Sequence, residues 1–235
     1  MNQLAKSLAA DGFSFMRGHD MRVLLGPMAD WDAFARSWDD LGLDTYMADG
    51  GRYRKRRFAA FGARASEPIH RKTHQPHYQS RDYNPLNGGI ARWFDPVLPE
   101  IAAGASMTVI LAACRKLFEQ LAPTRNWHIE VHQFRIETGS GKAGRPTPEG
   151  MHRDGVDYVL VLLIGRRNVQ SGVTSIRGTE GRDLGSFTLT EPCDAAWVDD
   201  HRVTHGVTPV EPIDPSEPGF RDVLVVTFRH EAEAA

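Results

Sequence analysis

Two hydrophobic patterns divide the chain near residue 127. Before that point, apolar residues recur every three to four positions, as on one face of a helix, most clearly in segments 26–42 and 106–122. After it, short apolar runs are separated by Gly, Pro, Asp and Asn, which is typical of β-strands joined by turns. Strands of this length and spacing predict a sandwich or barrel rather than alternating strands and helices.

The expected fold is mainly β with flanking helices. Its strands are expected at 52–62, 127–137, 157–164, 172–178, 185–191, 194–200, 202–210 and 221–230. A length of 235 residues fits one large domain. We therefore expect a single domain over 1–235, with N-terminal helices packed on the outside of the sandwich.

Charge and cysteine content argue against several kinds of partner. The net charge of −2 and the isoelectric point near 6.6 give no overall attraction to nucleic acid or anionic membranes. The basic run 52–57 leads into an apolar stretch, so we interpret it as a solvent-exposed strand, although one arginine could face a pocket. Two cysteines are too few for a disulfide framework, and no apolar run approaches the roughly 18 residues of a membrane helix. We expect a cytoplasmic protein with neither nucleic acid nor membrane as a partner.

A possible chelate, His152 and Asp154, precedes the most apolar run of the chain. Residues two apart on an extended segment point to the same face. The motif alone is weak, because 10 histidines and 30 acidic residues in 235 produce one or two such pairs by chance, and His128 with Glu130 is a second. His205 strengthens the first pair, since it shares a strand face with two valines and should point inward.

Two imidazoles and one carboxylate form the facial triad of non-haem Fe(II) oxygenases, but zinc accepts the same ligands. Arg221 favours an oxygenase, because it opens the apolar inward face of the last strand and its guanidinium fork suits a carboxylate. Arg229 shares that face but lies at the frayed end of the strand. Two alternatives stay open: a cupin-like Zn or Mn isomerase or hydrolase, and a non-enzymatic sandwich that binds a small ligand.

The amino-acid sequence around these residues resembles that of the Fe(II)/2-oxoglutarate-dependent dioxygenases. The similar stretches are "HQFRI", "EGMHRDGVDYV", "RVTHGVTPV" and "FRDVLVVTF", with "YRKRRFAAF", "HQPHYQS" and "GGIARWF" upstream. The resemblance runs from about Tyr53 to Phe228. It is to the bacterial branch that includes L-isoleucine dioxygenase and other hydroxylases of free L-amino acids, some associated with biofilm and stress responses. It implies a double-stranded β-helix, or jelly roll.

The resemblance also implies cofactors and a reaction. Fe(II) would be bound by His152, Asp154 and His205, and 2-oxoglutarate by the metal and Arg221. Dioxygen would take the last metal position, with ascorbate as the expected reductant in vitro. The products would be succinate, CO2 and a hydroxylated or sulfoxidised substrate, because related halogenating enzymes lack the metal-binding carboxylate that Asp154 provides here.

Candidate substrate residues follow from the needs of a free amino acid, which requires a cation for its carboxylate and an acceptor for its ammonium group. Arg135 and Asp157 are the candidates for these roles, and Tyr83 and Asn84 in a polar loop are further candidates. His132 is expected to pack or hydrogen-bond locally. The sequence predicts neither the particular amino acid nor the oligomeric state.

Overall fold

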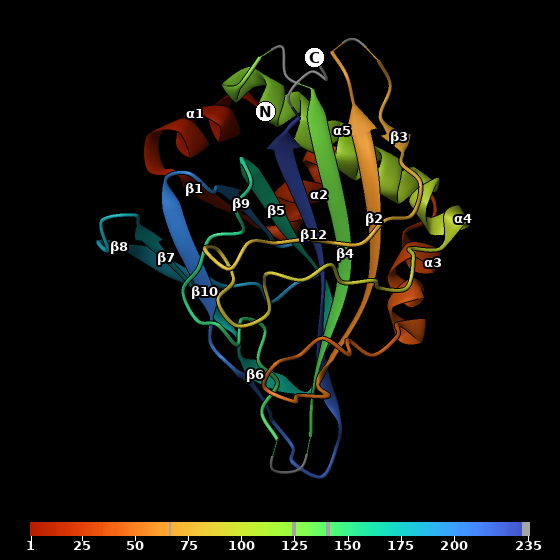
Figure 1. Ribbon diagram of the computed structural model, residues 1–235, viewed down its shortest axis with the longest axis vertical. Helices are drawn as coiled ribbons and strands as arrows, with labels where there is room; N and C mark the ends of the chain where they lie inside the picture. Colours follow the sequence, from red (N-terminus) through yellow and green to blue (C-terminus); the bar gives the residue numbers. More distant parts are fainter. Residues whose placement is uncertain (66, 124–125, 140–141, 232–235) are drawn as a thin grey trace.

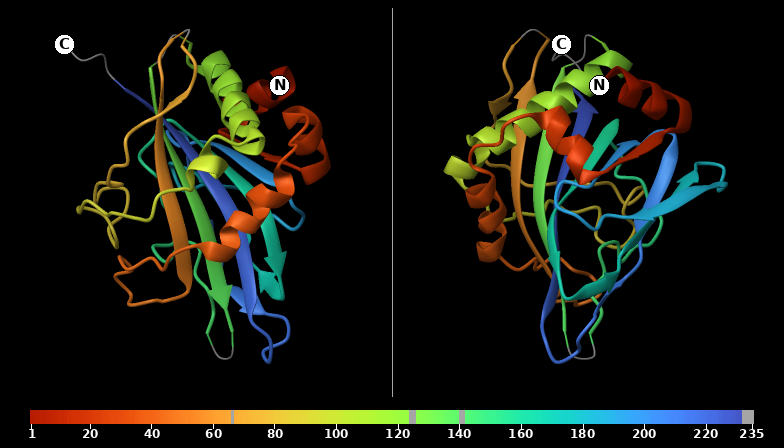
Figure 2. Two further views of the ribbon diagram at one scale, coloured as in Figure 1. Left: turned by 90° about the vertical axis from the view of Figure 1, so that its right-hand side faces the viewer. Right: turned by 180° about the vertical axis from the view of Figure 1, so that it is seen from behind.

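The computed structural model describes residues 1–65, 67–123, 126–139 and 142–231. It places a large sheet between a layer of helices and two smaller sheets (Figures 1 and 2). The helical elements are α1 (Asn2–Asp11), α2 (Gly18–Leu25), α3 (Trp31–Arg36), the 3-10 helix η1 (Ser37–Asp40), α4 (Pro99–Ala102) and α5 (Ala105–Leu121). The strands are β1 (Phe13–Met16), β2 (Arg54–Ala63), β3 (His70–Arg71), β4 (Trp127–Thr138), β5 (Tyr158–Arg167), β6 (Val169–Ser171), β7 (Val173–Gly178), β8 (Asp183–Thr188), β9 (Ala195–Asp199), β10 (Val203–Val207), β11 (Val210–Pro212) and β12 (Gly219–His230).

The large sheet has seven antiparallel strands in the order β1-β9-β5-β12-β4-β2-β3. The smaller sheets, β10-β7-β8 and β11-β6, pack against its inner face. Strands that are neighbours in the large sheet, such as β4 and β12, are far apart in sequence, so the chain passes repeatedly between the two layers. This arrangement confirms the predicted jelly-roll sandwich.

Most elements lie where the hydrophobic pattern predicted them. The helix expected in 106–122 is α5, and the helix expected in 26–42 is α3 continued by η1. The predicted strand 202–210 is divided between β10 and β11. Strand β1 was not predicted, because four residues are too few to show a period; pairing with β9 holds it at the sheet edge. Within the described residues, no helix is both long and apolar enough to cross a membrane.

The strands of the large sheet have two chemically different faces. On β4, Trp127, Ile129 and Val131 are buried among side chains of α5 and the other helices, which cover this side of the sheet (Figure 2). The intervening His128 and Glu130 point to the opposite side. Each large apolar side chain that becomes fully buried contributes about 1.5–3 kcal/mol. The helix-covered face therefore stabilises the fold, while the inner face is free to carry charge.

The interpretation of 52–57 as a solvent-exposed strand is wrong. Arg54, Arg56 and Arg57 are only 6%, 4% and 8% exposed. Asp44 compensates two of these charges, because one of its oxygens lies 2.8 Å from Arg54 Nη2 and 3.6 Å from Arg56 Nη1. The basic run could not reveal this by itself, since the compensating carboxylate comes from a separate loop.

Removal of the Asp44 carboxylate is expected to destabilise the fold strongly. Asp44→Ala leaves Arg54 and Arg56 buried without this partner, and breaking a buried ion pair from one side typically costs about 3–5 kcal/mol. Urea unfolding followed by circular dichroism measures the free energy of unfolding. The control is Asp11→Ala at an exposed position of α1, expected to change that energy by less than about 0.5 kcal/mol. If Asp44→Ala lowers the free energy of unfolding by less than about 1 kcal/mol, the assigned ion pairs of Asp44 with Arg54 and Arg56 are contradicted.

Candidate active site

A cavity of about 260 Å³ lies against the inner face of the large sheet. Alternate residues of β2, β4 and β12 form one wall, and β10 with parts of segments 77–84 and 146–156 forms the other. The loop between β3 and α4, yellow in Figure 1, crosses in front of these strands. The three predicted metal ligands and Arg221 all line this cavity.

His152 and His205 are joined through their backbones. The amide of each residue donates to the carbonyl of the other at 2.9 Å, so the two face each other as an antiparallel pair. Their side chains therefore lie on the same side, with ring centroids 4.5 Å apart. This bridge connects the loop before β5 to β10 and sets the separation of two nitrogen ligands.

Asp154 completes the triad. One carboxylate oxygen lies 3.7 Å from His152 Nε2 and the other lies 3.6 Å from His205 Nε2. The ligand atoms of all three residues lie within 4.8 Å of one another. His152 Nδ1 is 3.0 Å from the carbonyl of Gly150 and donates to it, which leaves the Nε2 lone pair available. This donor set fits a divalent metal with open positions on the cavity side.

Asp200 holds the turn that carries Asp154. Its carboxylate accepts hydrogen bonds from the three successive backbone amides of residues 154–156, at 2.9, 2.7 and 3.1 Å. Gly155 has a φ of +80°, and a Cβ at this position would lie 2.4 Å from the ring of Tyr83. Only glycine fits both conditions, so the turn that follows the ligand is closely specified.

His152 carries an extra proton between the carboxylates of Asp154 and Glu149. Burial lowers the pKa of His152, but its hydrogen bond to Asp154 and the charges of Asp154 and Glu149 outweigh this and raise the pKa to about 9. Burial raises the pKa of Asp154, and the two histidines more than reverse that effect, so its pKa lies well below the usual range. Burial and the charge of His152 lower the pKa of His205 to about 4. A metal cation would replace this proton at the same place.

Arg221 is 2% exposed and its guanidinium borders the cavity. Its Nε and Nη2 atoms have no hydrogen-bond partner among the residues that the structure describes. Burial and the charge of Arg166 lower the pKa of Arg221 to about 10, so it stays protonated at neutral pH. Because an unpaired buried cation is costly, these donors fit a ligand carboxylate, which can accept two parallel hydrogen bonds.

Two of the predicted substrate residues, Tyr83 and Asn84, line the cavity. Asn84 donates to the side-chain oxygen of Gln79 at 3.0 Å, and Gln79 donates to the carbonyl of Asp154 at 3.0 Å. This chain of hydrogen bonds ties the loop to the turn that carries Asp154.

The other two, Arg135 and Asp157, do not border the cavity. Arg135 faces the helix side of β4, where its Nη2 lies 2.7 Å from Asp222. Asp157 lies 3.0 Å from the Nε2 atom of His201, which is largely exposed. Both charges are thus paired elsewhere, and their predicted contact with substrate disagrees with the geometry.

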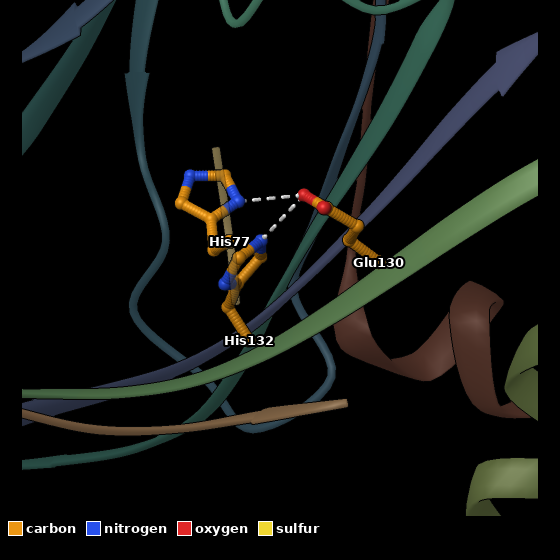
Figure 3. Close-up of side chains that lie close together, drawn as sticks. All are labelled: His77, Glu130 and His132. Atoms are coloured by element: carbon orange, nitrogen blue, oxygen red, sulfur yellow. Dashed lines mark hydrogen bonds and ion pairs between the residues drawn. The ribbon is translucent and has the colours of Figure 1, made fainter. Parts of the chain in front are cut away.

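The cavity contains a second cluster, formed by His77, Glu130 and His132, that was not predicted from the sequence. Both imidazoles are directed at one oxygen of Glu130 (Figure 3). His132 bonds locally, as expected, but it also lines the cavity. A signal existed in the sequence, because Glu130 belongs to the second His-x-acid pair and shares a β4 face with His132. His77 comes from a loop whose position no local pattern predicts.

Comparison with known proteins gives the family. A family model described as 2OG-Fe dioxygenase matches residues 35–227. A 3(1)-hydroxy-L-isoleucine 4-dioxygenase of Pantoea ananatis (strain AJ13355) is 24% identical over 245 residues, which cover 99% of this chain and 98% of that protein. A bsmA homologue from Methylobium petroleophilum PM1 is 36% identical, and its crystal structure has a TM-score of 0.89 over 99% of this chain and 95% of the other.

The fold is also shared with IDO from Bacillus thuringiensis, which is 16% identical and has a TM-score of 0.80 over 98% of this chain and 95% of the other. The region that the family model matches contains all three predicted metal ligands and Arg221. On this match, and with a donor set that fits iron, the chain is an enzyme that belongs to the 2OG-Fe dioxygenase family.

Proposed function

We propose that the protein uses Fe(II), 2-oxoglutarate and dioxygen to hydroxylate or sulfoxidise a free L-amino acid, with release of succinate and CO2. The observation that carries the proposal is one cavity that contains both the triad and a buried arginine with unpartnered donors. The chemistry that bound iron supplies is oxygen activation, with 2-oxoglutarate as the source of two electrons. One oxygen atom then enters succinate and the other enters the substrate.

The residues of the chain divide the remaining work. His152, Asp154 and His205 would hold the iron on one side, and Asp200 would keep the Asp154 turn in place. Arg221 would bind the distal carboxylate of 2-oxoglutarate. Its position next to the cavity and away from bulk water makes that contact stronger than it would be at the surface.

An amino acid substrate is supported by the relative from Pantoea ananatis, whose name states an amino acid derivative as its substrate. The small cavity, lined by charged groups and by several valines, fits a ligand with a charged head and an apolar side chain. Tyr83 and Asn84 stay candidates for contact with it. The cupin-like and non-enzymatic alternatives give no role to Arg221, and membership of a biofilm-associated branch stays a prediction.

Asp154→Ala is expected to abolish Fe(II)-dependent turnover while the fold is retained, because two neutral imidazoles hold iron poorly. The protein is incubated with Fe(II), ascorbate, dioxygen, 2-oxoglutarate and each L-amino acid in turn. Succinate and products heavier by one oxygen atom are measured, with circular dichroism as the test of folding. The control is Asp183→Ala at an exposed position of β8. Undiminished turnover in Asp154→Ala would refute the triad.

Arg221→Lys is expected to raise the KM for 2-oxoglutarate by about 10- to 100-fold, because an ammonium group cannot reproduce two parallel hydrogen bonds to a carboxylate. Initial rates at saturating amino acid measure this constant. Arg229→Lys changes an exposed arginine on the same face of β12 and is the matched control. If the effect appears in Arg229→Lys and not in Arg221→Lys, the two arginines have been assigned in the wrong order.

Asp200→Asn is expected to weaken metal binding by about 10- to 100-fold, as is typical when a group that orients a ligand is lost. The amide nitrogen of asparagine cannot accept from the amides of the Asp154 turn. Calorimetric titration with Mn(II) measures the dissociation constant without turnover. Asp199→Asn changes the neighbouring acid, whose carboxylate accepts from the amide of His201 instead, and should have no such effect. Equal affinity for Mn(II) in Asp200→Asn and Asp199→Asn would show that Asp200 does not orient the Asp154 ligand.

A further inference from the structure

The cluster of Glu130, His77 and His132 lines the cavity but is separate from the metal triad. His77 Nδ1 lies 2.8 Å from Glu130 Oε2, and His132 Nε2 lies 3.5 Å from the same oxygen (Figure 3). Arg56 Nη2 lies 2.6 Å from His132 Nδ1. Because arginine can only donate, the His132 proton must be on Nε2, directed at Glu130. Both histidines therefore donate to one carboxylate.

Glu130 is ionised, whereas His77 and His132 are neutral. Burial raises the pKa of Glu130, but its contacts with His77 and the other histidines outweigh this and hold the pKa well below its usual range. Burial lowers the pKa of His77, and it lowers that of His132 to about 3. The cluster thus adds one negative charge to the cavity wall.

The hydrogen bonds disfavour a second metal here, although the donor atoms alone would suit one. A metal bound to His132 Nε2 would require the proton to move to Nδ1, which would break the bond from Arg56. Arg56 and Arg92 also border this part of the cavity, and their charges act on Glu130. A ligand that brings both a cation and an anion satisfies all of these groups.

Arg92 supplies an available positive charge beside Glu130. Arg92 and His77 exchange backbone hydrogen bonds at 2.9 Å, so they lie opposite each other with their side chains on the same face. In such a pair the Cα atoms are about 5.5 Å apart. Arg92 is 2% exposed, and its Nε has no hydrogen-bond partner in the described part of the chain. Arg54, by contrast, is bound to Asp44.

We propose that Glu130 and Arg92 bind the charged head of a zwitterionic substrate, Glu130 accepting its ammonium group and Arg92 binding its α-carboxylate. The inference rests on the proposed function and gives to these residues the roles that the sequence suggested for Asp157 and Arg135. An α-amino acid carries its ammonium group and its carboxylate on the same carbon. Glu130 and Arg92 offer the complementary charges close together, because Arg92 lies opposite His77 and His77 contacts Glu130. The side chain of the substrate then extends toward the triad, so oxidation occurs on the side chain.

Arg92 and Arg221 have separate ligands under this assignment. Arg221 lies opposite Ile136 in the register of β12 and β4. Ile136 is six residues from Glu130, or about 20 Å along the strand. The cavity can therefore hold the distal carboxylate of 2-oxoglutarate at one end and the head of the amino acid at the other. Peptides and N-acyl amino acids lose at least one charge of that head and should be rejected.

Analogues that lack one charge test the proposal on the unmodified protein. The protein is loaded with Mn(II) and 2-oxoglutarate under nitrogen, and binding is measured by calorimetry without turnover. The probe is the standard L-amino acid that raises the unfolding temperature most, with its des-amino acid and its des-carboxy amine. For L-isoleucine these are 3-methylpentanoic acid and 2-methylbutylamine. Both analogues should bind at least about 10-fold more weakly than the amino acid.

Variants assign each charge to its residue. Glu130→Gln should weaken binding of the amino acid by about 10- to 100-fold and leave that of the des-amino acid unchanged. Arg92→Gln should weaken the amino acid similarly and leave the amine unchanged. Stabilisation by 2-oxoglutarate should persist in both, which shows that the fold and the cosubstrate site are intact. Glu180→Gln and Arg182→Gln, both largely exposed, are the matched controls.

Several results would overturn the proposal. Equal binding of the amino acid and its analogues by the unmodified protein would do so even if both variants failed to fold. Equal weakening of all three probes in a variant would indicate a structural role only. A second equivalent of Mn(II) that is lost in Glu130→Gln would indicate a metal site instead. If no amino acid binds while 2-oxoglutarate still stabilises the protein, the head-group site is wrong and the oxygenase assignment stands; no effect of 2-oxoglutarate would contradict the proposed function itself.

Discussion

Charge compensation within the sandwich is the constraint on which the rest of the structure depends. The inner face of the large sheet withdraws charged side chains from water, so each needs a partner or a ligand. Asp44 compensates Arg54 directly, and neutral histidines donate to Glu130. Arg92 and Arg221 are buried equally well but retain donor atoms without a protein acceptor among the described residues. Under the proposed function, these donors are reserved for the carboxylates of small molecules.

The helix-covered face makes such a polar interior possible. Apolar side chains of β4, β5 and β12 pack there against α5 and the N-terminal helices, and this burial offsets the cost of the charged cavity. The indole of Trp38 adds a specific link, because its Nε1 donates to the carbonyls of Phe134 and Val223, on β4 and β12. Val223 lies where the register between β12 and β5 shifts. Packing on one face thus fixes the strands whose other face lines the site.

The sequence predicted the parts of the site that depend on strand alternation. His152, Asp154, His205 and Arg221 became candidates because side chains two residues apart share a face, and the structure brings all four to one cavity. The same rule, applied strictly to β4, would have excluded Arg135, which alternates with the cavity-facing His132 and Phe134. Residues supplied by loops, such as Arg92 and Asp44, could not be placed, since nothing local to a loop shows which strand it will cover. The burial of the basic run on β2 was misjudged for that reason.

The loop between β3 and α4 contacts both halves of the cavity. Gln79 in this loop donates to the carbonyl of Asp154, while His77 and Arg92 border Glu130. The proposed iron ligands and Arg221, however, lie outside it. In evolutionary terms, the loop is a unit of diversification: its replacement can change which substrate head and shape are accepted while the oxygen chemistry is inherited intact. Gln79, Asn84 and Tyr83 contact or support the turn that carries Asp154, so enzyme engineering by loop exchange should retain these three residues and vary the others.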